Sequence, residues 1–124
     1  MDAGLSKKER ICSQKAIGQL VAGGHYVVSG PLRCCYRVRE DRDDDPVNRI
    51  LVSVPKKHFK RAVWRNRLKR RIREAYRLQK SLLKPRAVDI MLFHSAHQAA
   101  SFEEIRDAVA KVLGTIDNRL SGQE

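Results

Sequence analysis

The fold is decided by residues 61–77, RAVWRNRLKRRIREAYR, in which apolar and cationic positions recur with the period of an α-helix. One face of this helix carries the apolar side chains of Trp64, Leu68, Ile72, Ala75 and Tyr76. Such a stripe docks a helix onto a hydrophobic core. Pro85 ends the pattern because proline cannot continue a helix. The sequence therefore predicts one long helix from about residue 61 to residue 83.

The opposite face of this helix is almost entirely cationic. It presents Asn66, Lys69, Arg70, Arg73 and Arg77, while Arg65, Arg67 and Arg71 flank the apolar stripe. Like charges at i,i+4 spacing repel by a few tenths of a kcal/mol per pair, and a polyanion is the simplest partner that offsets this repulsion. Arginine suits phosphate because its guanidinium is a planar fork of donors. Asn66 can bond a base edge or a ribose hydroxyl because its amide both donates and accepts.

The distribution of charge supports a dedicated binding element. The chain has 124 residues and a net charge of +12. Residues 56–86 contain 14 cationic side chains and one acid, Glu74, whereas the rest of the chain has 12 cations and 13 acids. Such a concentration favours nucleic acid as the partner, with an incidental basic face as the alternative. The acidic stretch 40–46, EDRDDDP, is expected to be a solvated loop.

The segments around the basic helix predict an αβββαβα order. A first helix, 14–22, is capped by Ser13 and ends at Gly23 and Gly24. Strands are predicted at 25–29, 32–38, 49–54 and 88–93. The last of these, VDIMLF, is a nearly continuous apolar run, which favours burial on both faces.

A final helix begins after the cap residue Ser101 and is expected to end near Gly114. Its buried stripe is Phe102, Ile105, Val109, Val112 and Leu113. A helical crossover joins strands 49–54 and 88–93, so these two strands should be parallel. We therefore predict an α/β (α+β) sandwich, with residues 1–124 forming one domain around a four-stranded mixed sheet and flexible ends at 1–9 and 118–124.

Several other classes of protein are disfavoured. The odd number of cysteines, Cys12, Cys34 and Cys35, predicts reduced thiols and no disulfide framework. The histidines at 25, 58, 94 and 97 are scattered, so we expect them at the surface or at cleft edges, with no metal site and no histidine pair for a nuclease acting alone. No run approaches the roughly 20 apolar residues of a membrane span, and no signal-peptide pattern is present, so we expect a cytoplasmic protein.

Residues 61–77 closely resemble the RNR helix of the bacterial ribonuclease P protein family. Arg65-Asn66-Arg67 is followed in the family's register by Leu68-Lys69-Arg70, Ile72-Arg73 and Tyr76. The segments VSVPKK (52–57), VDIMLF (88–93) and SFEEI (101–105) also fit, and residues 10–24 fit more loosely. Other RNA- or DNA-binding proteins, such as ribosomal proteins, remain the first alternative, followed by a protein nuclease acting alone and then by a peripheral membrane protein.

The resemblance implies the protein subunit of an endoribonuclease that removes the 5′ leader of precursor tRNA. The partners would be the catalytic RNA subunit and the leader, with no membrane and no protein partner. The protein would supply no catalytic residue and bind no metal, and Mg²⁺ would be held mainly by RNA. By position, the RNA contacts would be Lys56, Lys57, Arg61, Arg65, Asn66, Arg67, Lys69, Arg70 and Arg73. A leader-binding cleft between the first helix and the sheet would be lined by Tyr36, Ile17, Val21 and Ser53, where Ile17 and Val21 replace the family's usual Phe.

Overall fold

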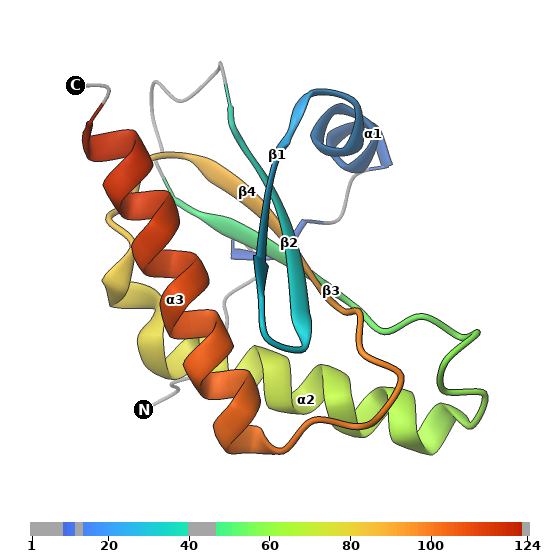
Figure 1. Cartoon of the computed structure of the whole chain (residues 1–124). Helices are drawn as coiled ribbons and strands as arrows, with labels where there is room; N and C mark the ends of the chain where they lie inside the picture. Colours follow the sequence, from blue (N-terminus) through green and yellow to red (C-terminus); the bar gives the residue numbers. More distant parts are fainter. Residues whose placement is uncertain (1–8, 12–13, 40–46, 123–124) are drawn as a thin grey trace.

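The computed structural model describes residues 9–11, 14–39 and 47–122. Figure 1 shows the predicted order of helices and strands, which is confirmed. The elements are α1 (Gln14–Gly23), β1 (His25–Ser29), β2 (Leu32–Val38), β3 (Arg49–Ser53), α2 (Ala62–Gln79), the short 3-10 helix η2 (Lys80–Leu82), β4 (Val88–His94) and α3 (Phe102–Ser121). Ser13, Cys12 and the acidic stretch 40–46 lie outside the described residues.

The sheet is mixed, as predicted, and has the strand order β1-β2-β4-β3. The strand β4 pairs antiparallel with β2 and parallel with β3, because α2 carries the chain from β3 across to β4. Its position between two neighbours explains its continuous apolar sequence, since most of its side chains are buried.

A tight turn at Gly30 and Pro31 sets which side chains of β1 and β2 share a face. Gly30 has a φ of 52°, a left-handed conformation that glycine adopts without steric cost. The turn pairs Ser29 with Leu32, and alternation along the strands then places Tyr36 on the same face as Val27. Tyr26 and Cys35 lie on the other face.

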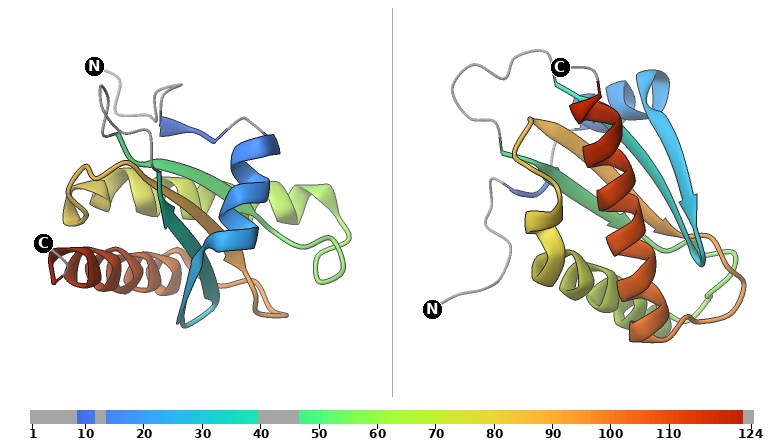
Figure 2. Two further views of the ribbon diagram at one scale, coloured as in Figure 1. Left: turned by 90° about the horizontal axis from the view of Figure 1, so that it is seen from above. Right: turned by 60° about the vertical axis from the view of Figure 1, so that its left-hand side comes forward.

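Each face of the sheet has its own apolar cluster. On one face, α2 and α3 pack over a large core that includes Leu32, Cys34, Ile90 and Leu92. On the other face, α1 packs over a small cluster formed by Ile11, Leu20 and Cys35, with Ala16, Ile17, Leu51 and Met91 at its margin. Figure 2 shows the resulting layers from two further directions. The helices thus fill one face and cover only part of the other.

Gly24 joins α1 to β1 at a point of very close approach. A Cβ atom at this position would lie 2.4 Å from the carbonyl oxygen of Leu20 and 2.5 Å from Sγ of Cys35. The same two groups are hydrogen-bonded, since the Cys35 thiol donates to the Leu20 carbonyl over 3.3 Å. Only glycine fits here, so α1 is seated tightly against β2.

Two helix ends differ from the sequence-based expectation. The helix α3 does not end at Gly114 but continues to Ser121, and Ile116 is fully buried. Glycine inside a helix costs about 1 kcal/mol, whereas burying an isoleucine contributes about 1.5–3 kcal/mol, so packing outweighs propensity. Residues 118–121, which we expected in a flexible end, are helical. The long basic helix ends at Gln79, and its last turn tightens into η2 instead of running as α-helix to residue 83.

A buried carboxylate ties together the strands β2, β4 and β3. Asp89 accepts hydrogen bonds from Nη1 of Arg39 at 2.7 Å, and from Nε and Nη2 of Arg49 at 2.8 and 2.7 Å. The Asp89 side chain is only 5% exposed. Burying a charge without partners is costly, and the two arginines offset the cost of burying the Asp89 carboxylate in the central strand.

Candidate nucleic-acid interface

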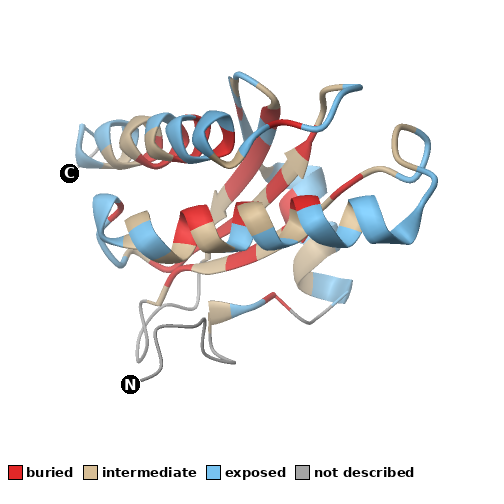
Figure 3. Ribbon diagram, turned by 90° about the horizontal axis from the view of Figure 1, so that it is seen from below, coloured by how far each residue is buried: buried red, intermediate tan, exposed pale blue. Residues whose placement is uncertain are grey.

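The helix α2 is anchored by its apolar face and displays its cations to solvent. Leu68, Ile72, Ala75 and Tyr76 are buried, as predicted. Figure 3 shows buried and exposed positions interleaved along α2. Trp64 was expected on the same docking face, but it is 38% exposed. The reason is its place in the helix: the first turn of α2 precedes Leu68, the first position that the core covers.

We call the cationic part of α2 and the loop before it the basic surface. It consists of Lys56, Lys57, Lys60, Arg61, Arg65, Asn66, Arg67, Lys69, Arg70 and Arg73. All nine residues predicted to contact RNA are therefore brought together, and Lys60 joins them because it is exposed in the same loop. Arg65 and Lys69 are half-buried and the others are exposed. Within the described ranges, none of these cations forms an ion pair with an acidic side chain, so their charges remain available to a polyanion.

Two arginines at the edge of this surface also hold the structure in place. Nη1 of Arg65 donates to the carbonyl oxygens of Phe59 and Lys60, at 2.8 and 2.7 Å. Nη1 of Arg71 donates to the carbonyl oxygen of Ala100 at 2.6 Å. Arg65 thus fixes the loop before α2, and Arg71 connects α2 to the segment before α3. These two guanidinium groups therefore add positive charge at the basic surface and also hold the adjoining backbone in position.

The four residues predicted to line a leader cleft do not come together. Ile17, Val21 and Ser53 lie on the side of the sheet that α1 partly covers. Tyr36 lies on the opposite face, only 4% exposed, where its hydroxyl oxygen accepts from Nη1 of Arg119 at 3.3 Å. It cannot share a cleft with the other three.

Tyr26, which sequence reasoning missed, is an exposed aromatic side chain on the α1 side, where Phe93 also lies opposite Ser53. Tyr26 is 47% exposed, and the guanidinium carbon of Arg33 lies 5.3 Å from its ring centroid. The pKa of Tyr26 is raised by the charge of Cys35 and by the hydrogen bond that the Tyr26 hydroxyl donates to Sγ of Cys35. The two-residue turn at Gly30-Pro31 was the available signal, because it dictates which tyrosine shares a face with Cys35.

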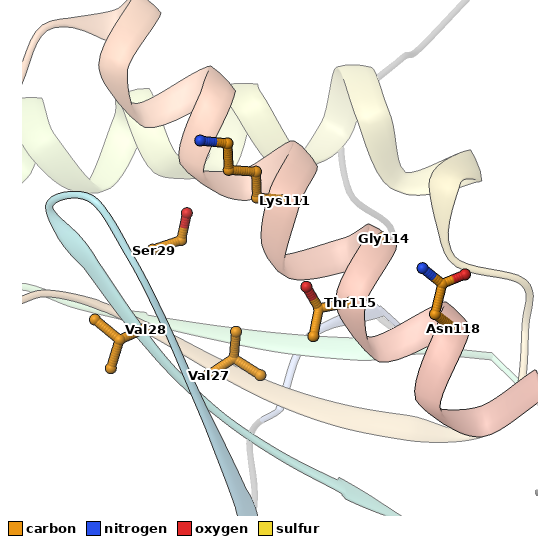
Figure 4. Close-up of a pocket in the computed structure, with 7 residues that line it drawn as sticks. All are labelled: Val27, Val28, Ser29, Lys111, Gly114, Thr115 and Asn118. Carbon is orange, nitrogen blue, oxygen red and sulfur yellow. The ribbon is translucent and has the colours of Figure 1, made fainter. Parts of the chain in front are cut away.

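A pocket of about 410 Å³ lies between β1 and α3, on the face of the sheet opposite α1 (Figure 4). Its lining consists of Val27, Val28, Ser29, Lys111, Gly114, Thr115 and Asn118. Gly114 has no neighbour within 4 Å of the position where a Cβ would lie, so its missing side chain helps to keep the hollow open. Lys111 is the one cation in the lining of the pocket, so the pocket is much less positively charged than the basic surface.

Three of the histidines are gathered beside the start of α2, contrary to the scattering expected. The rings of His58 and His97 are 4.1 Å apart between centroids, and Phe59 contacts His94 edge-on at 5.3 Å. His94 is fully buried: its Nε2 accepts from the amide of Ala100, which leaves the proton on Nδ1, facing the Ala96 carbonyl oxygen at 3.2 Å. Loss of solvation lowers the pKa of His58, with smaller contributions from His97 and Lys57.

The free energy of unfolding should decrease as the pH falls through about 6.5, the ordinary pKa of histidine. Burial is the main cause that lowers the pKa of His94, so the unfolded chain takes up a proton that the folded protein does not bind. Urea titrations at several pH values measure this slope. His94→Gln should have a shallower slope, and His25→Gln, at an exposed position, should behave as the parent does. Equal slopes for the parent and His94→Gln would contradict the assignment.

Neither a metal centre nor a membrane helix is found in the part of the chain that the structure describes. Among those residues no three histidine, cysteine or acidic side chains are grouped to hold a metal ion. No helix formed by them has the length and apolar character to cross a membrane.

The protein is a single-domain α+β protein with a mixed four-stranded sheet and two helices, α2 and α3, packed on one face. The outer side of α2 is cationic and exposed to solvent, which suits binding of a polyanion. The chain belongs to the ribonuclease P protein family: the family model described as Ribonuclease P matches residues 5–117. The fold predicted from the sequence is the fold of this family's solved structures.

Similar proteins agree with this assignment. The ribonuclease P protein component of Porphyromonas gingivalis is 48% identical over 80 residues, which cover 64% of this chain and 58% of that protein. The component of Chlorobaculum tepidum is 40% identical over 82 residues, covering 64% and 53%. The match thus spans a little over half the length of these curated relatives. The structure of the Staphylococcus aureus RNase P protein is 25% identical, with a TM-score of 0.70 over 87% of this chain and 94% of that one. The Thermotoga maritima RNase P protein is 20% identical, with a TM-score of 0.72 over 86% and 96%, and supports the fold.

Proposed function

We propose that this chain is the protein subunit of a ribonuclease P that removes the 5′ leader from precursor tRNA in the cytoplasm, and that the catalytic centre lies in the RNA subunit. The basic surface carries this proposal, since ten polar or cationic side chains are clustered there on α2 and the loop before it. These side chains would displace the cations condensed around the phosphates of the RNA subunit, and the release of those counterions favours binding at low salt. Family membership supports the choice of RNA as the polyanion.

The leader would lie against the sheet face that α1 covers only in part. Ile17, Val21 and Ser53 are on this side, and Tyr26 takes the aromatic role first given to Tyr36. A base can stack on the part of the Tyr26 ring that Arg33 leaves open, while the guanidinium of Arg33, which lies over the ring, can meet a phosphate. Contacts to the leader would raise affinity for precursor over mature tRNA, because mature tRNA lacks the leader.

Mg²⁺ is assigned to the RNA subunit in this proposal. When bound there, it would supply an activated water for hydrolysis of the phosphodiester. The protein's part is to neutralise phosphates close to the reaction, which lowers the Mg²⁺ concentration that the RNA needs in order to fold and to hold the substrate.

The direct test is cleavage of a precursor tRNA by bacterial ribonuclease P RNA at low Mg²⁺, with and without the protein. We expect cleavage at the correct 5′ site to be stimulated by the protein, and no cleavage by the protein alone. A precursor with its leader shortened to one nucleotide should lose much of the stimulation. Cleavage by the protein without RNA, or no stimulation despite tight binding to unrelated RNAs, would overturn the proposal.

A further inference from the structure

Trp64 is a bulky apolar side chain left exposed in the middle of a cationic surface. Its indole is 38% exposed, and the neighbouring Val63 is 63% exposed. Both belong to the first turn of α2, one turn before the first buried residue, Leu68. Packing therefore covers part of the indole and leaves the rest of this large aromatic group accessible among cationic side chains.

The surroundings of the indole specify what kind of group can cover it. The guanidinium carbon of Arg67 lies 5.0 Å from the indole ring centroid, which is a cation–π contact. Lys60 and Arg61 are exposed just before the helix, and Arg70 lies one turn beyond Arg67. A partner must therefore offer a flat apolar face together with negative charge. An unpaired nucleotide has both, since its base stacks on aromatic rings and its phosphate meets arginine.

We propose that Trp64 and Arg67 form a stacking site for one unpaired base of RNA. This inference rests on the proposed function, because the basic surface must first bind RNA. The base lies on the indole, and the guanidinium of Arg67 either continues the stack or bonds the adjoining phosphate. The first turn of α2 then favours single-stranded RNA, whereas the middle of α2, with Asn66, Arg70 and Arg73, meets the backbone of either form.

The chain contains one tryptophan, so its intrinsic fluorescence reports on this site alone. The protein is titrated with a single-stranded oligoribonucleotide, with a fully paired RNA of the same number of phosphates, and with inorganic polyphosphate. We expect the single strand to change the Trp64 emission strongly. Polyphosphate should bind and compete with RNA while changing the emission little, since it has no base to stack.

Substitutions separate stacking from charge. Trp64→Ala should weaken binding of the labelled single strand by roughly 5- to 100-fold, as expected for loss of one base–aromatic stack. Trp64→Phe should keep most of the affinity because it retains a ring. The matched control is Val63→Ala in the same exposed turn, which should bind RNA as the parent does. Polyphosphate affinity should be the same in all three variants, and circular dichroism with urea unfolding checks that each is folded.

Failure of this inference is distinguishable from failure of the proposed function. If the protein binds RNA but the Trp64 emission responds equally to polyphosphate, or if Trp64→Ala binds the single strand as well as Val63→Ala does, the stacking site is wrong and the basic surface stands. If no RNA is bound, both are wrong. A concentration-dependent dimer in sedimentation that Trp64→Ala abolishes would assign the indole to a second copy of the chain and overturn the proposal.

Discussion

The double variant Arg70→Gln/Arg73→Gln should bind RNA roughly 20- to 60-fold more weakly than the parent at about 0.1 M salt. Both side chains are exposed on the middle of α2, and neither forms an ion pair with a described acidic residue. If each contacts one phosphate, the slope of log K against log salt should become shallower by about 1.4 for single-stranded RNA and about 1.8 for a duplex. Filter binding or fluorescence anisotropy over a range of salt concentrations measures both quantities.

The control for this variant removes the same amount of charge from another helix. Arg106 and Lys111 are exposed on α3, so Arg106→Gln/Lys111→Gln loses two cations outside the basic surface. We expect this control to change the affinity only slightly through the lower net charge. If the two double variants weakened binding equally, RNA would be attracted by the overall charge of the protein and α2 would not be the binding element.

Asp89→Ala should lower the free energy of unfolding by about 3–5 kcal/mol. The substitution removes the carboxylate that accepts hydrogen bonds from both Arg39 and Arg49, so two partly buried guanidinium groups lose a short ion pair. Their side chains are only 12% and 26% exposed, so water replaces the lost partner poorly. Urea unfolding, followed by circular dichroism, gives the difference in free energy.

Glu74→Ala is the matched control for this loss, because Glu74 also pairs with an arginine, Arg77, but on the surface of α2. The Glu74 side chain is 44% exposed, so the cost should stay below about 1 kcal/mol. Similar losses for Asp89→Ala and Glu74→Ala would mean that burial does not set the value of these ion pairs, and our account of the central strand would be wrong.

Much of the fold could be predicted because its signals are local and periodic. The apolar positions of α2 recur every three to four residues, and Leu68, Ile72, Ala75 and Tyr76 are buried as that period requires. The parallel pairing of β3 with β4 followed from the helical crossover between them. The end of α3 could not be predicted, because it depends on Ile116 reaching the core, a contact with residues far away in the sequence.

The candidate site was predictable on α2 and less so on the sheet. The cationic side of an exposed helix faces solvent whichever core residues pack under its apolar side. The residues predicted on α2 to contact RNA are therefore together in the structure. Tyr36 was misplaced because a strand has two faces, and a resemblance in position does not say which one a side chain occupies. The strand pattern held the answer: Leu32, Cys34 and Tyr36 alternate with Arg33 and Cys35, which puts Tyr36 with the apolar set. The gathering of His58, His94 and His97 brings the loop before α2 to the end of β4 and the loop after it, and it has no sequence signal.

The central place of β4 in the sheet has a consequence for how the chain folds as it is synthesised. In the order β1-β2-β4-β3, no strand of the sheet lies beside β3 until β4 has been made, although Arg10 forms a single bridge to Ile50, and β4 is the last strand in the sequence. At translation rates of 5–20 residues per second, the start of α2 at Ala62 precedes the end of β4 at His94 by roughly two to six seconds. The nascent chain therefore presents its most cationic segment before the sheet that supports it can form. Any RNA near the ribosome meets that segment first as an unsupported polycation.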